Sequence, residues 1–246
     1  AELADHLTTW RRAIEHDAAD ALALAWPLGN YWMFEGRLAE GETELRRVLD
    51  ATSSDTSVER ADALIVAGWI EVFRNRLDRA IAWTEEALAT YRASGDRRRV
   101  AFGLTRAGHW AFASGDGARG VSLLQESLAL CDEIGFEDGK AWPTVLLAQA
   151  RRWSGDESSD VRAMLLDARR RFVETGETYG QVHADMLLGS CYEFPAQERL
   201  RFAEEMVELS AGPGGENLMR PIAFHNIAYP LHALGEHQRA TDFNRA

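Results

Sequence analysis

A pair made of an apolar residue and a small residue recurs along this chain at an almost constant interval. The small residues of successive pairs lie 39, 40, 40, 41 and 39 positions apart. They are Gly29, Gly68, Gly108, Ala148, Gly189 and Ala228. Two antiparallel helices approach closely only where no side chain holds them apart, and a single hairpin cannot bury both of its apolar faces. The interval therefore predicts an all-α fold, an α-solenoid of about six helix hairpins with a period near 40 residues.

Glycines at the ends of the hairpins support the same register. Gly95, Gly135 and Gly176 each follow a long predicted helix, at intervals of 40 and 41 positions. A glycine at such a place can adopt the left-handed conformation that closes a helix. A turn residue also follows each small residue by seven positions. These turn residues are Gly36, Asn75, Gly115, Gly155, Ala196 and Gly235.

The spacing of apolar residues predicts a leading helix, five hairpins and the start of a sixth. The predicted helices are Leu3–His16, Asp20–Phe34, Arg37–Ala51, Val58–Arg74, Leu77–Ala93, Arg97–Ala113, Ala118–Glu133, Asp138–Trp153, Val161–Val173, Tyr179–Tyr192, Gln197–Leu209, Pro221–Leu234 and one from Gln238 onward. Thr56 and Glu59 predict a capping box. Pro27 and Pro230 lie inside predicted helices, where a proline removes a backbone donor and bends the helix. The segment Ser210–Asn217 is predicted to be the most flexible loop.

Composition and charge argue against several classes of protein. The net charge of −12 is unsuited to binding the phosphate backbone of nucleic acids. Two cysteines make no disulfide framework, and Cys131 falls at a predicted core position. There is no signal peptide and no apolar run near the ~20 residues of a membrane span, so the predicted location is the cytoplasm. The chain begins at Ala1 inside a helical pattern, which indicates that residues 1–246 are a single domain of a longer protein.

No residue pattern indicates catalysis, a cofactor or a metal. The segment Gly115–Gly120 matches the glycine spacing of a dinucleotide-binding loop, but it follows a predicted helix, whereas that loop must follow a strand. His225 and His232 could share one helix face, but two histidines without a carboxylate partner are more often structural than metal ligands. We therefore predict no enzyme activity, no cofactor and no metal site.

The hairpins resemble tetratricopeptide repeats. The residues that carry this resemblance are Ala67, Gly68, Ala80, Ala87, Ala107, Gly108 and Gly115. A standard copy of that repeat has ~34 residues, so the longer period implies longer helices here. The resemblance implies a superhelix, right-handed by analogy.

The first fifty or so residues resemble a more specific family. They look like the start of the repeat region in large bacterial STAND-type signal-transduction ATPases. The residues that carry this resemblance are Trp32, Gly36, Arg37, Leu38, Glu40, Gly41, Leu45 and Leu49. In those transcriptional regulators the repeats follow a nucleotide-binding domain, often with a LuxR-type or winged-helix DNA-binding domain elsewhere. The resemblance implies that this segment is a sensor or an autoinhibitory arm.

The tetratricopeptide resemblance also implies that the first helix of each hairpin lines a concave face. Side chains at those positions mix aromatic rings with hydrogen-bonding groups, which is typical of a ligand or peptide site. The predicted groove residues are Asn30, Trp69, Phe73, His109, Gln149, Arg152, His183, Glu193, His225 and Tyr229. Roughly half of the aromatic residues on these helices are expected to pack between repeats instead.

We therefore predict a non-catalytic tetratricopeptide-type binding or sensor domain of a transcriptional regulator. Its concave face would bind a peptide, a protein partner or a small inducer, and this segment would contact neither nucleic acid nor membrane. One alternative is a self-association scaffold, because an incomplete sixth repeat leaves an apolar edge that a symmetric homodimer could cover. Another is an enzyme, which would need acid and base groups gathered in a closed pocket.

Overall fold

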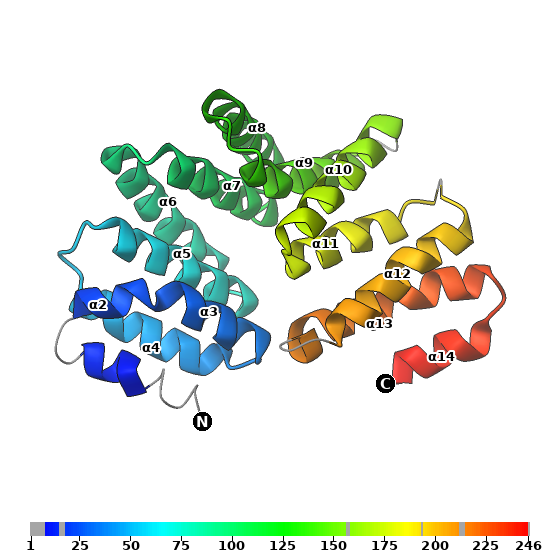
Figure 1. Ribbon diagram of the computed structural model, residues 1–246, viewed down its shortest axis with the longest axis horizontal. Helices are drawn as coiled ribbons and strands as arrows, with labels where there is room; N and C mark the ends of the chain where they lie inside the picture. The colour runs from blue at the N-terminus through cyan, green and yellow to red at the C-terminus, as the bar shows by residue number, and fades with distance from the viewer. Residues whose placement is uncertain (1–7, 15–17, 156–157, 193, 212–214, 246) are drawn as a thin grey trace. The chain divides into compact units, whose positions relative to one another are not determined.

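A computed structural model describes residues 8–14, 18–155, 158–192, 194–211 and 215–245, and these residues form helices and turns without a strand. Residues 8–14 are helical and precede the helices labelled in Figure 1. The helices that follow are α2 (Ala18–Ala23), α3 (Ala25–Phe34), α4 (Leu38–Ala51), α5 (Val58–Phe73), α6 (Leu77–Ser94), α7 (Arg97–Ala113), α8 (Gly117–Ile134), the 3-10 helix η1 (Asp138–Lys140), which Figure 1 does not label, α9 (Ala141–Trp153), α10 (Ser159–Thr175), α11 (Thr178–Gly189), α12 (Ala196–Ser210), α13 (Gly215–Ala233) and α14 (His237–Arg245). The predicted all-α class is confirmed. The chain divides into two compact units, Ala1–Leu130 and Cys131–Ala246.

Pro27 divides the first predicted hairpin helix in two, as its position suggests. α2 ends at Ala23 and α3 begins at Ala25, because Pro27 has no N–H with which to bond the carbonyl of Ala23. Leu24 donates its N–H to the Ala21 carbonyl at 3.0 Å instead. The helix therefore restarts one residue later.

The predicted capping box at the start of α5 is wrong by one residue. Ser57 caps this helix, and its hydroxyl accepts the backbone N–H of Arg60 at 3.2 Å. The N–H of Ser57 is itself bonded to Asp55 Oδ1 at 2.6 Å. Because Thr56 lies outside the cap, Glu59 cannot complete a reciprocal pair with it.

Two other predicted boundaries also differ from the structure. α13 begins at Gly215 and stays helical across Pro221 and Pro230, so the predicted flexible loop is shorter than expected. Residues 212–214 of that loop lie outside the described residues. α11 ends at Gly189, before the predicted end at Tyr192. A proline inside a helix removes only its own N–H bond, and the remaining bonds carry α13 past both prolines.

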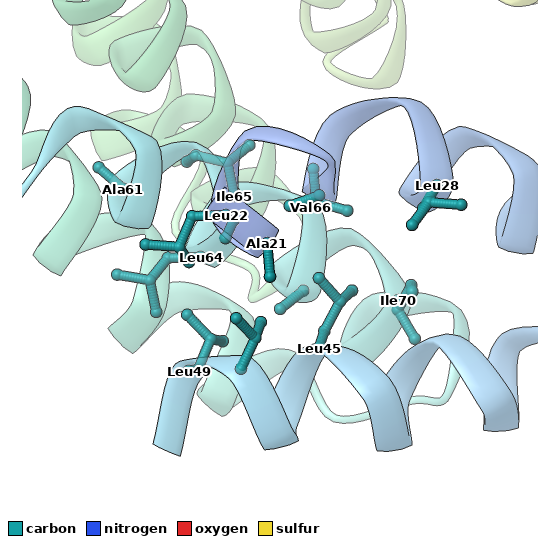
Figure 2. Close-up of a cluster of buried hydrophobic side chains, with 14 of the residues drawn as sticks. Ala21, Leu22, Leu28, Leu45, Leu49, Ala61, Leu64, Ile65, Val66 and Ile70 are labelled. Atoms are coloured by element: carbon teal, nitrogen blue, oxygen red, sulfur yellow. The ribbon is translucent and has the colours of Figure 1, made fainter. Parts of the chain in front are cut away.

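The core of the first unit forms where α2, α3 and α4 pack against α5. Figure 2 shows apolar side chains from these helices gathered in one cluster. Trp10 and Trp32 are both fully buried in it, and their rings meet edge to face with centroids 5.7 Å apart. Removing such rings from water is the largest single contribution that a side chain can make to a core of this kind.

Asp62 links three consecutive helices of the first unit. The buried Tyr91 of α6 donates its hydroxyl to Asp62 Oδ1 at 2.7 Å, and Arg99 of α7 pairs with the same carboxylate at 3.1 Å. Burial and the Asp62 carboxylate raise the pKa of Tyr91, so this hydroxyl remains a donor at any physiological pH. One carboxylate of α5 thereby fixes α6 and α7 beside it.

Both sets of predicted turn glycines adopt the left-handed conformation. The three closing glycines Gly95, Gly135 and Gly176 have φ values of 73°, 64° and 70°. The hairpin-turn residues with positive φ are Gly36, Asn75, Gly115, Gly155 and Gly235. The fifth hairpin departs from the prediction, because Ala196 is the first residue of α12 and not a turn residue.

Gly108 and Gly68 hold equivalent positions in α7 and α5 but differ in the space around them. A Cβ atom added at Gly108 would lie 2.8 Å from Leu124 Cγ and 3.1 Å from the Gly120 carbonyl oxygen, whereas at Gly68 its nearest neighbour would be 3.5 Å away. We expect Gly108→Ala to lower the midpoint of thermal unfolding. Gly68→Ala should raise it, because alanine is favoured over glycine inside a helix by ~0.5–1 kcal/mol. Circular dichroism would measure both, and a rise in both variants would contradict the close helix crossing at Gly108.

The second unit repeats the design from α9 to α14. α10 buries one face, made of Val161, Leu165, Ala168 and Phe172. α12 packs against both α11 and α13, and an apolar cluster continues from α12 through α13 to α14. Within this unit, α11 packs between α10 and α12, and α13 packs between α12 and α14.

Candidate functional site

Trp69 lies at the centre of an aromatic cluster on the first helices of the first unit. Its ring centroid lies 6.0 Å from that of Phe73, 6.2 Å from His109 and 5.4 Å from Trp110. His109 stacks on Trp110 at 4.7 Å, and the Trp110 indole N–H donates to Thr84 Oγ1 at 3.1 Å. α5 and α7 thus bring together three of the predicted residues, Trp69, Phe73 and His109.

Arg106 of α7 supports this cluster from inside. Its side chain is buried, and its guanidinium carbon lies 4.7 Å from the centre of the Trp69 ring and 5.1 Å from that of Phe102. A cation over an aromatic face is attracted by the negative charge of the π system, and more strongly where water is excluded. Arg106 therefore fixes the orientation of the Trp69 ring.

The outer rings of the cluster remain partly accessible. Phe73 is 36% exposed, and Trp26, which meets Phe102 edge to face at 5.4 Å, is 42% exposed. The predicted residue Asn30 lies one helical turn beyond Trp26 on α3 and is half-buried. We call the set Trp26, Trp69, Phe73, Phe102 and His109, with Arg106 beneath it, the Trp69 cluster.

Gln149 of α9 and His183 of α11 meet in the second unit. Gln149 Oε1 lies 3.2 Å from His183 Nε2, and because an amide oxygen only accepts, His183 donates through Nε2. The ring of Trp142 lies 5.7 Å from the rings of both His183 and Tyr179, and 5.2 Å from that of Phe172. A second group of polar and aromatic side chains thus forms on the first helices, from two predicted residues and their neighbours.

Arg152 is engaged within the chain. Its Nη1 donates to Cys191 Sγ at 2.9 Å, and its Nη2 donates to the Ser190 carbonyl at 3.0 Å. These bonds hold the end of α9 against the end of α11. Arg152 therefore has a structural partner at the place where the sequence predicts a groove residue.

Two more of the predicted residues contact each other on α13. His225 and Tyr229 are both exposed on α13, and Tyr229 Oη lies 3.2 Å from His225 Nε2. His232 contacts the start of α14, where its Nδ1 lies 3.0 Å from His237 Nδ1. Glu193 falls outside the described residues.

The predicted groove residues omit Arg106 and Tyr179, which the structure places among them. Arg106 follows Phe102 by four positions and precedes His109 by three, while Tyr179 precedes His183 by four. Residues three and four apart lie on one face of a helix. This spacing is the signal in the sequence that identifies both.

A charged cluster connects α11 to the helices on either side. Asp185 of α11 is fully buried, and Arg169 of α10 donates through Nε to Asp185 Oδ1 at 2.5 Å and also pairs with Glu205 of α12. Burial raises the pKa of Asp185 to about 7, because lost hydration outweighs the attraction of Arg169 and the Glu205 carboxylate adds repulsion. Asp185 follows His183 by two residues on the same helix.

Other chemistry finds little support in the part of the chain that the structure describes. Gly115–Gly120 lies at the turn between α7 and α8, so it follows a helix and lacks the setting of a dinucleotide loop. Within the described ranges, no three His, Cys, Asp or Glu residues gather as a metal site would require, and no helix is long and apolar enough to cross a membrane. A cavity of about 40 Å³ lined by α6, α7 and the turn into α8 has room for about one water molecule.

Comparison with known proteins gives one sequence match and several structural ones. No family model matches the chain. Over 98 residues it is 34% identical to the regulatory protein AfsR of Streptomyces griseus, which is 39% of this chain and 10% of that protein. Its structure is similar to a STAND protein with a tetratricopeptide repeat sensor from Pyrococcus horikoshii, with a TM-score of 0.63 and 15% identity over 95% of this chain and 37% of that one.

Two Rap structures are also similar. Apo RapI superposes with a TM-score of 0.72 and 10% identity over 100% of this chain and 90% of that one. A Rap protein complexed with competence and sporulation factor gives a TM-score of 0.65 and 14% identity over 98% of this chain and 70% of that one. At these identities the structures show a shared fold.

The chain therefore spans 10% of AfsR and 37% of the STAND protein. The sequence match is to a regulatory protein, and one structural match is to a STAND protein that carries a tetratricopeptide sensor. Both agree with the resemblance carried by Trp32, Gly36, Gly41 and their neighbours. The resemblance to the tetratricopeptide region of STAND-type regulators is confirmed, and the chain has the helical-repeat fold of that region.

Proposed function

We propose that this chain is a non-catalytic sensor domain of a transcriptional regulator that binds a peptide, a protein partner or a small inducer on its first helices. The Trp69 cluster carries the proposal, since its rings are partly exposed and yet held in place by a buried cation. In this proposal residues 1–246 act as one tetratricopeptide-like domain, whose concave face carries the cluster. The domain would work in the cytoplasm.

The cluster has the physical character of a binding surface. Rings that are already fixed lose little conformational freedom when a ligand covers them. Covering Phe73 and Trp26 would remove apolar surface from water, at ~25 cal/mol per Å². His109, the polar member of the same cluster, would then set the orientation of a ligand, as a few placed polar groups do in most binding sites.

Two of the similar structures support a sensor role. One carries a tetratricopeptide repeat sensor in a STAND protein, and another was determined in complex with competence and sporulation factor. By analogy, ligand binding here would release or restrain ATPase and DNA-binding parts of the parent regulator. The net charge of −12 favours contact with those protein parts over direct contact with nucleic acid.

Thermal unfolding in the presence of short peptides and metabolites would test this function. A ligand at a hundred times its dissociation constant should stabilise the chain by ~2.7 kcal/mol. His109→Ala should abolish the stabilisation by a ligand that binds the Trp69 cluster. His183→Ala should abolish the stabilisation by a ligand that binds beside Gln149 and His183. The matched control is His232→Ala, an exposed histidine of α13 that contacts α14.

The outcomes of this experiment separate the proposal from its rivals. A ligand that stabilises all three variants as it does the wild type would place the site away from both groups. If no peptide or metabolite stabilises the chain, the purified ATPase and DNA-binding parts of the parent are the next partners to test. If those also fail to bind, the sensor function is wrong.

Self-association is a second candidate function, favoured by two strongly exposed aromatic residues. Trp153 at the end of α9 is 68% exposed and Tyr192 is 72% exposed, and apolar rings in water often mark a contact surface. Light scattering would distinguish the two functions. A stable dimer of twice 27.4 kDa that persists at low concentration and hides the first helices would favour assembly over sensing.

A further inference from the structure

An ion pair between the half-buried Arg169 and the buried Asp185 in the second unit stands where the first unit has two leucines. Leu88 of α6 and Leu104 of α7 are buried in one apolar cluster. Leu88 and Arg169 each come seven positions before the closing glycine of their helix, and Leu104 and Asp185 each come four positions before the small residue of theirs. Both pairs are 16 residues apart. The contact between equivalent positions of consecutive helices is therefore apolar in the first unit and charged in the second. We call this contact between α10 and α11 the joint.

Arg169 holds three helices at this joint. It bonds Asp185 of α11 at 2.5 Å and pairs with Glu205 of α12, and its guanidinium carbon lies 5.7 Å from the centre of the Phe202 ring. Asp185 is 0% exposed, and its Oδ2 has no direct hydrogen-bond partner among the described residues. The amide of Gln181, one turn earlier on α11, favours the charged form of Asp185 only weakly.

Stability alone does not account for this arrangement. A buried ion pair recovers at best about what its desolvation costs, and apolar residues of similar volume are often as good or better. Leu88 and Leu104 show that two leucines suit the position. The cluster of Asp185, Arg169 and Glu205 also carries two negative charges against one positive charge. One bound proton would balance it.

We propose that Asp185, Arg169 and Glu205 form a proton-binding joint within α10, α11 and α12. When Asp185 takes up a proton from solvent, Arg169 pairs with Glu205 alone, and α11 is held to α10 by apolar packing without the charge pair. α11 also carries His183, which contacts Gln149 of α9. Proton binding therefore changes the position of α11 and, with it, the hydrogen bond between His183 and Gln149. Only this last consequence rests on the proposed function, because proton binding itself needs no ligand.

The charged groups that act on Asp185 come from two of the neighbouring helices. They are Arg169 of α10 and Glu205 of α12. On the other helices that pack against α11, Arg152 of α9 bonds the end of α11, and His225 of α13 contacts Tyr229. His183 is a second titratable group on α11 itself, so its contribution must be separated by substitution.

The raised pKa of Asp185 determines whether stability rises or falls with pH. The pKa of Asp185 is raised to about 7 in the folded chain, against ~3.9 in an unfolded one. Between these values the folded state holds a proton that the unfolded state does not, so stability falls as pH rises from 4 to 7. Between pH 6 and pH 8, the equilibrium constant for opening of α11 should increase about tenfold.

Hydrogen–deuterium exchange of the full chain at pH 6 and pH 8 tests this inference. After division by the intrinsic exchange rate at each pH, α11 amides should open about tenfold more often at pH 8. The double variant Arg169→Leu/Asp185→Leu, which copies Leu88 and Leu104, should lose this difference. His183→Gln should keep it, and the amides of α7 should show no such change in any variant.

Asp185→Asn provides a second variant that keeps the shape of the side chain and cannot titrate. It should also lose the tenfold difference, even if the double leucine variant fails to fold. The inference is overturned if Asp185→Asn keeps the full pH dependence, or if wild-type α11 shows none. A difference that His183→Gln removes would assign the effect to the histidine and overturn it as well.

Discussion

Arg169→Leu alone should lower the free energy of unfolding of the second unit by about 3–5 kcal/mol. The substitution leaves Asp185 buried without its cation, and an uncompensated buried charge is costly. The loss of stability has an upper limit, because Asp185 can take up a proton instead of staying charged. Protonating an aspartate with an unfolded pKa of ~3.9 at pH 7 costs ~4 kcal/mol. Urea unfolding at pH 7, followed by circular dichroism, would measure the loss.

The double variant Arg169→Leu/Asp185→Leu is the control for this loss. It should be as stable as the wild type or more stable by up to ~4 kcal/mol, because two leucines need no hydration and no partner. If the double variant is as unstable as Arg169→Leu alone, the charged joint stabilises the fold in its own right. That result would remove the reason to propose that the cluster of Asp185, Arg169 and Glu205 serves to bind a proton.

Phe172→Ala should also cost about 3–5 kcal/mol, the usual loss for a large ring removed from a core. Phe172 is 1% exposed, and its ring lies 5.2 Å from that of Trp142. Its loss would leave a cavity beneath Trp142 and remove the support of the ring that contacts His183. The midpoint of urea unfolding and its slope would report this destabilisation.

Val173→Ala is the matched control, one residue further along α10. Val173 is 49% exposed, and substitutions at such surface positions usually change stability by no more than ~0.5 kcal/mol. Equal losses for Phe172→Ala and Val173→Ala would mean that the face of α10 turned to the core has been wrongly identified.

The repeat pattern predicts the fold because each helix buries the same face in every copy. Tyr91, Cys131 and Phe172 all come four positions before a closing glycine, and all three are buried. The predicted burial of Cys131 is confirmed for this reason. Spacing alone fixes which face of a helix is apolar, so helix positions and core residues follow from it.

The cap of α5 shows where such reasoning fails. Thr56 and Ser57 both carry a hydroxyl that can cap a helix, and the choice between them depends on the bond from Ser57 to Asp55. Periodicity holds no information on that bond. The start of α13 at Gly215 was missed for a related reason, since Pro221 reads as a first-turn residue although six helical residues precede it.

The candidate site could be predicted only in part, because contacts between side chains depend on rotamers and on neighbouring helices. The spacing of first helices places Trp69 near His109, as observed. It cannot tell that Arg152 turns to Ser190, or that His232 turns to His237. Whether the residues of the predicted groove bind a ligand stays a prediction.

The closing glycines also bear on how a chain of this kind can change in length. Gly95 and Gly135 end α6 and α8 in the same backbone conformation, one period apart. A segment that runs from one closing glycine to the next begins and ends beside similar apolar helix faces. When such a segment is added or deleted, the hairpins on either side of it still have a complementary apolar face to pack against. Removing a single helix would instead leave an unmatched face in water. Insertions and deletions should therefore be tolerated in steps of about 40 residues, so that hairpin number can vary independently of the design of any one hairpin.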